Sequence, residues 1–244
     1  MAEVLNFEHN GITVNATESP EAMGGLGDNV IGLVGTAPNA HASIPKNAPF
    51  RINSFTTQAL LDPTGTESGT LFQAVYQILK VVKVPVYVVI VEEGATPADT
   101  INNVIGGNDP VTGRKLGLAA LSSVPEDLTI IGAPGFTGTK AVAGEFASFG
   151  KRIKARVVLD GKDASVADQV TYSGELGGAD LGFDRCLLVH NMPSVYSKAA
   201  KKNVFLSPSS LAIAALAKVK QWESPGNQVT FAEDVSRVVE YNIL

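Results

Sequence analysis

The sequence contains a single cysteine, Cys186, and this scarcity excludes two kinds of stabilising site. One cysteine forms neither a disulfide within the chain nor a thiolate metal cluster. Because Cys186 lies inside an apolar run, we expect a small buried side chain rather than a nucleophile. The three histidines, His9, His41 and His190, are far apart and lack partners at ligand spacing, so we expect no metal site and no cofactor.

Long apolar runs and clustered positive charge are also missing. The longest apolar stretch, residues 81–91, includes Lys83 and is far too short to cross a bilayer. The amino terminus has no signal-peptide pattern, so we expect folding in a reducing cytoplasm. The net charge is −5, and basic residues gather only at 151–154 and 198–202. We therefore expect neither membrane insertion nor nucleic acid binding.

The 244 residues, 45% of them hydrophobic, are enough for one large domain or two small ones. Residues 1–28 offer little to bury, and their second part, residues 17–28, is a stretch of Gly, Pro and acids, which is typical of an extended arm. From residue 29 onward, short apolar runs predict strands at 29–35, 50–53, 85–91, 128–132, 156–160 and 185–190. Helical periodicity predicts helices at 71–82, 115–122, 140–152, 163–173 and 207–220, the last beginning with Ser207 as N-cap and Pro208 as N1.

This alternation predicts an α/β fold with a mixed, largely parallel sheet, flanking helices and an extended N-terminal arm. In such sheets ligands bind beyond the carboxyl ends of the strands. Four polar residues lie at or just after the carboxyl ends of the predicted strands: Glu92, Glu93, Asp160 and His190. Asp160 and His190 could form an acid–base pair, but polar strand ends are common in this fold and no third group converges on them.

A loop at residues 132–140 (GAPGFTGTK) follows a predicted strand and opens a predicted helix, which is the setting for binding phosphate on backbone N–H groups. Its candidate residues are Gly135, Thr137, Gly138 and Lys140, with Asp160 as a metal or acid–base group. The loop lacks the Gly-Lys-Ser/Thr ending of a Walker A motif. A tight strand-to-helix turn explains the same glycines without any ligand.

Three segments, taken in order, resemble the contractile tail sheath family of phage tails and pyocin-like particles. The first is VIGLVGTAP at 30–38 followed by PFRI at 49–52; the second is IIGAPGF at 130–136 followed by ARVVLDG at 155–161. The third is LSPS at 206–209 followed by WESPGNQ at 222–228. The resemblance spans residues 4–240, and it is the order and spacing of the segments that make it specific.

The resemblance implies a structural, non-enzymatic subunit of the virion tail, assembled in the host cytoplasm. Such subunits polymerise around a tail tube and contract to drive it through the target cell envelope. The implied partners are neighbouring sheath subunits, the tail tube protein, and baseplate and tail terminator proteins. Extended arms in this family add strands to sheets of neighbouring subunits. In this chain the corresponding inter-subunit arm residues are Val4, Leu5, Phe7, Ile12 and Val14.

The resemblance also implies a domain organisation. Residues 1–28 are the linker arm, and residues 29–228 are the α/β sheath body, with residues 95–190 as a candidate inserted subdomain. Residues 229–244 correspond to the start of a C-terminal domain that is otherwise absent from this chain.

Two other functions stay open at this stage. The first is a nucleotide- or phosphate-binding α/β enzyme that uses the loop from Gly135 to Lys140, and the second is a periplasmic-type or scaffolding module that binds protein alone. Arg51, Arg152 and Glu92 are candidate interface charges, although surface charges are usually only solvated.

Overall fold

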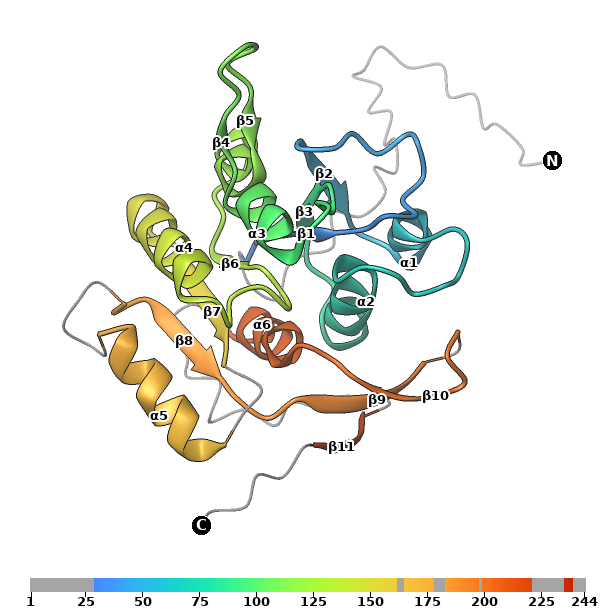
Figure 1. Ribbon diagram of the computed structural model, residues 1–244. Helices are drawn as coiled ribbons and strands as arrows, with labels where there is room; N and C mark the ends of the chain where they lie inside the picture. Colours follow the sequence, from blue (N-terminus) through green and yellow to red (C-terminus); the bar gives the residue numbers. More distant parts are fainter. Residues whose placement is uncertain (1–28, 162–164, 178–182, 198, 221–234, 239–244) are drawn as a thin grey trace, which may run out of the picture.

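The computed structural model describes residues 29–161, 165–177, 183–197, 199–220 and 235–238. Residues 235–238 are described by their backbone alone. The predicted arm residues Val4, Leu5, Phe7, Ile12 and Val14 lie outside the described residues. Within the described part, a central sheet is flanked by helices and a second, smaller sheet extends beside it (Figure 1).

The central sheet has six strands in the order β2-β3-β1-β6-β7-β8. Neighbouring strands are parallel except β2 and β3, which are antiparallel at one edge. The strands are β1 (Ile31–Thr36), β2 (Pro49–Ile52), β3 (Val86–Val91), β6 (Ile130–Gly132), β7 (Arg156–Asp160) and β8 (Cys186–Val189). This arrangement confirms the predicted mixed, largely parallel α/β fold.

Helices cover both faces of this sheet (Figure 1). On one face lie α2 (Leu71–Val81) and α6 (Pro208–Lys218), packed against Ile31 and Leu33 of β1. On the other face lie α3 (Pro97–Ile105), α4 (Lys140–Ile153) and α5 (Val166–Glu175), packed around a cluster that includes Val34 of β1. Successive side chains of a strand point to opposite faces, so a strand covered on both faces must be apolar throughout. That is why the strands appear in the sequence as continuous apolar runs.

The second sheet is antiparallel, with the order β10-β9-β11. Its strands are β9 (Pro193–Ser197), β10 (Lys202–Phe205) and β11 (Val235–Val238). The β9–β10 hairpin passes beneath α6 and extends away from the central sheet (Figure 1). A two-stranded ribbon, β4 (Gly107–Asn108) and β5 (Lys115–Leu116), projects from the opposite end of the molecule (Figure 1).

The prediction of an α-helix at residues 115–122 is wrong. These residues form β5 and then a 3₁₀ helix, η2 (Gly117–Ser123). Gly117 separates the two elements with φ +53°, and a Cβ there would lie 2.4 Å from the carbonyl oxygen of Asn103. The end of α3 packs closely against Gly117, and the segment forms two short elements instead of one helix. The apolar residues of the two elements nevertheless have the spacing of a single helix.

Other elements were not predicted. The segment after β2 contains α1 (Phe55–Gln58) and a 3₁₀ turn, η1 (Ala59–Leu61). The helix α3 and the β9–β10 hairpin were also not predicted. No helix in the described ranges combines the length and the hydropathy needed to span a membrane.

Candidate functional site

The carboxyl edge of the central sheet is where an α/β fold of this kind would hold a ligand. Taken in chain order, the five parallel strands have the spatial order 2-1-3-4-5, so the connections turn to opposite sides between β1 and β6. Ligands in doubly wound sheets bind in the crevice at this switch point. The described side chains at this edge therefore decide what the fold can do there.

Asp160, at the end of β7, is the centre of a polar network at this edge. Its side chain is buried. Each of its two carboxylate oxygens accepts two hydrogen bonds. Oδ2 accepts from the Gly135 backbone N–H at 2.9 Å and from the Thr137 hydroxyl at 3.1 Å. Oδ1 accepts from the Ser207 hydroxyl at 2.5 Å and from the Ser209 backbone N–H at 2.9 Å. Asp160 thus joins the turn after β6 to the start of α6.

The same network explains two features of the sequence. Gly135 has φ +84°, a left-handed conformation that favours glycine, and its N–H also donates to Ser207 Oγ at 3.1 Å. Ser207 is the N-cap of α6 and Pro208 follows in its first turn, as predicted. The Ser207 hydroxyl, however, makes no capping hydrogen bond to the helix and donates instead to Asp160. A charged acceptor at the helix start replaces the usual cap.

Thr137 links this network to the layer of helices. Its side chain is fully buried, and its hydroxyl oxygen accepts the Asp160 backbone N–H at 2.7 Å. Its carbonyl oxygen accepts a hydrogen bond from the Tyr172 hydroxyl of α5 at 2.8 Å. Burial, with smaller contributions from Glu175 and Asp160, raises the pKa of Tyr172 to about 12. Tyr172 therefore stays a neutral donor at ordinary pH.

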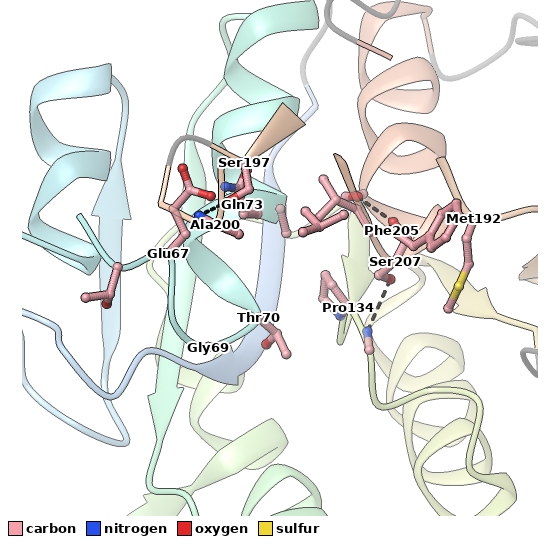
Figure 2. A pocket seen from close by; sticks show the side chains of 16 residues that line it. Glu67, Gly69, Thr70, Gln73, Pro134, Met192, Ser197, Ala200, Phe205 and Ser207 are labelled. Carbon is pink, nitrogen blue, oxygen red and sulfur yellow. Dashed lines mark hydrogen bonds between the residues drawn. The ribbon is translucent and has the colours of Figure 1, made fainter. Parts of the chain in front are cut away.

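Two cavities adjoin this edge. One, of about 440 Å³, lies between the start of α2, the turn after β6 and the β9–β10 hairpin. Figure 2 shows Thr70 and Gln73 on one side of it and Pro134 and Ser207 on the other. The second, of about 510 Å³, lies over the ends of β1 and β3 and the start of α3, and Gly135 lines both.

The charges around these cavities do not suit a phosphate. Among the described residues, Glu67 is the single charged residue lining the first cavity and Glu93 the single one lining the second, and none of the described Lys, Arg or His residues lines either. Lys140 is exposed and, like Gly138, lines neither cavity. The Gly135 N–H and the Thr137 hydroxyl are already bonded within the protein. The geometry therefore favours a structural turn over a phosphate-binding loop.

In the possible acid–base pair of Asp160 and His190, the Asp160 carboxylate is already hydrogen-bonded within the fold. Asp160 and His190 lie at the ends of the neighbouring strands β7 and β8, as expected. Both oxygens of Asp160 are occupied by the turn and by α6, so the carboxylate is committed to holding the fold together. Among the residues described, no group of three or more His, Cys, Asp or Glu side chains is placed to hold a metal ion.

The remaining candidate residues have local partners. Glu92 forms an ion pair with Lys46 at 2.7 Å, and Arg51 lies 3.7 Å from Glu126. The Arg152 guanidinium lies over the Phe149 ring, 4.9 Å from its centroid. All are contacts within the subunit, which leaves their predicted interface role untested.

Cys186, on the edge strand β8, is partly buried. Burial and, to a smaller extent, Asp184 raise the pKa of its thiol to about 11. The thiolate, which is the reactive form, is therefore scarce at neutral pH.

The second sheet presents a different kind of surface. Two of its aromatic side chains are largely exposed, Tyr196 on β9 at 58% and Phe205 on β10 at 50%. Within the described residues, β10 and β11 each pair on one side only, with β9 between them. Unpaired strand edges and exposed aromatic side chains are typical of surfaces that bind another polypeptide.

The fold is a doubly wound α/β domain with an appended antiparallel sheet. At the carboxyl edge of its central sheet, the Asp160 network joins polar groups of the protein to one another. The chain is 27% identical, over 251 aligned residues, to a protein named as a prophage major tail sheath protein of Pseudomonas aeruginosa (strain UCBPP-PA14). The alignment covers 97% of this chain and 62% of the relative. It supports a tail sheath family and confirms the resemblance seen in the three sequence segments. Comparison with protein-family models finds no match.

Proposed function

We propose that the chain is a structural subunit of a contractile tail sheath, which polymerises around a tail tube and contracts to drive the tube through the envelope of a target cell. The observation that carries the proposal is the similarity to a tail sheath protein along 97% of the chain. The Asp160 network supports it. At the edge where an α/β enzyme would bind its substrate, the polar groups of this network are hydrogen-bonded to one another.

In this proposal, residues 1–28 are a linker arm, residues 29–228 are the sheath body and residues 229–244 begin a further domain. The arm residues Val4 to Val14 add a strand to a sheet of a neighbouring subunit. Main-chain hydrogen bonds would supply the link and alternate side chains its register. The open edges of β10 and β11 are the described surfaces that best suit such pairing. Further partners would be the tube, baseplate and tail terminator proteins.

The chain spans 62% of the length of the relative it matches, so assembly is tested with and without the remainder. Negative-stain electron microscopy would examine the purified chain alone and the chain joined to the unmatched part of that relative. The proposal predicts rings or striated tubes from the joined chain. Monodisperse particles in both preparations, with the body folded by circular dichroism, would contradict it.

A further inference from the structure

The amino edge of the central sheet, opposite the Asp160 network, carries a basic pocket. The pocket has a volume of about 550 Å³, and the described residues that line it include three cations, Lys154, Arg156 and Arg185, and a single acid, Asp127. Its other lining residues are Asn29, Leu128, Thr129 and Ile153. These residues meet because they lie at or just before the amino ends of β1, β6, β7 and β8, which are parallel neighbours.

Part of the bonding capacity of these cations is already used within the subunit, at the end of a helix. The helix α4 ends at Ile153, and Lys154 is its C-cap with φ +62°. Arg185 Nη1 donates to the Lys154 carbonyl oxygen at 3.1 Å, which satisfies one group at the helix end. A guanidinium has five N–H donors, so most of its bonding capacity remains. Among the described residues, neither Lys154 nor Arg185 forms an ion pair.

The opposite charge is concentrated in the first 28 residues of the chain. They hold five acids, Glu3, Glu8, Glu18, Glu21 and Asp28, and no Lys or Arg. The rest of the chain has nineteen acids and nineteen basic residues. The whole net charge of −5 therefore belongs to residues 1–28.

This acidic segment joins the body at the rim of the basic pocket. Asn29 lines the pocket and is held in place, since its side-chain amide donates to the Ala217 and Val219 carbonyl oxygens at 3.1 and 2.8 Å. Asp28 is the next residue toward the amino terminus. An extended chain spans about 3.3–3.6 Å per residue, so Glu21 and Glu18 also reach the pocket easily.

We propose that the carboxylates of Glu18, Glu21 and Asp28 bind the basic pocket of their own subunit. These acids would then face Lys154 and Arg185, and the covalent connection at Asn29 gives them a high effective concentration there. This contact would fix the direction in which the arm leaves the body and would keep residues 4–14 available for a neighbouring subunit. The contact itself does not depend on sheath assembly, although its role in directing the arm rests on the proposed function.

Zero-length cross-linking of the dilute, full chain with a carbodiimide tests this contact. The reagent condenses a carboxylate with the Lys154 amine into an amide and takes up the water that is released. The first tryptic site is Lys46, so the expected product joins residues 1–46 to the short peptide 153–156, in the monomer fraction. We expect it to disappear in 1 M salt, where the screening length is about 3 Å. Lys140, exposed at the opposite edge, is the internal control and should form no such product.

Matched variants test which acids take part. Replacing Glu18, Glu21 and Asp28 by Gln, Gln and Asn should lower the yield at Lys154 about tenfold, the loss expected from several weak exposed ion pairs. Glu3→Gln with Glu8→Gln alters charge in the same segment and should leave the yield unchanged. The proposal is overturned if Lys154 is not cross-linked, if Lys140 reacts equally, or if the product occurs only in dimers. Because the monomer is measured, this failure is distinguishable from a failure to assemble.

Discussion

Substitution of Asp160 should destabilise the protein far more than a surface substitution. In Asp160→Ala, the Ser209 N–H loses its buried acceptor, and the Gly135 N–H and the Thr137 and Ser207 hydroxyls lose a charged one. Leaving a buried polar group unsatisfied costs about 1–3 kcal/mol, and breaking a buried charged network costs about 3–5 kcal/mol. We therefore expect a loss of about 3–5 kcal/mol in the free energy of unfolding.

Urea unfolding followed by circular dichroism measures this loss. Asp168→Ala is the matched control, because Asp168 also accepts hydrogen bonds from an N–H and a hydroxyl, both of Ser165, but in an exposed capping box. Its expected cost is about 1 kcal/mol. At about 2–4 °C per kcal/mol for a domain of this size, Asp160→Ala should also lower the Tm by about 10 °C. Equal losses for the two variants would refute the structural role of Asp160.

Four further results are expected. Tyr172→Phe leaves the buried Thr137 carbonyl oxygen without its donor and should cost about 1–2 kcal/mol in urea unfolding; no loss would show that water replaces the hydroxyl. Cys186, with a pKa of about 11, should react with a thiol reagent at pH 8 at least ~100-fold more slowly in the folded than in the unfolded chain, and equal rates would contradict its burial. Burial raises the pKa of Asp62, but hydrogen bonds from its neighbours outweigh burial and hold that pKa below 3.8. The ionised Asp62 side chain therefore stabilises the fold above this pH, and this stabilisation is lost as the pH falls through the lower, folded-state pKa. Asp62→Asn should accordingly be less stable than the natural chain at pH 7, with the difference shrinking toward pH 2, and a constant difference would contradict the linkage. Deletion of residues 1–15 should leave the unfolding free energy within about 0.5 kcal/mol and abolish linkage between subunits in electron micrographs; a loss of the size caused by a core substitution would place those residues in the core instead.

The central sheet was predictable because its four inner strands, β3, β1, β6 and β7, are buried on both faces. Runs such as residues 86–91 have no polar residue to interrupt them, and α2 buries one regular apolar stripe. The helix α3 escaped prediction because it is polar, with Val104 as its one buried residue. Its capping box, Thr96 and Asp99, was the signal that could have found it.

The Asp160 network was only partly predictable. The sequence indicates a turn at Gly135 and a helix starting at Ser207, both of which the structure contains. It does not indicate that Asp160 joins them, because the contacts span 23 to 49 residues and depend on the strand order. The one local hint is an acid that directly follows the apolar run of residues 157–159. The β9–β10 hairpin was missed because its exposed edge strand, KNVF, has little to bury.

Electron microscopy of tail particles with a gold-labelled antibody against residues 29–220 tests the sheath function most directly. The particles would come from the strain that encodes the chain. If the chain is a sheath subunit, label should be distributed at regular intervals along the outside of the tail shaft, between the baseplate and the head or cap. Label confined to another part of the particle, or purified particles that contain none of the chain, would contradict this function.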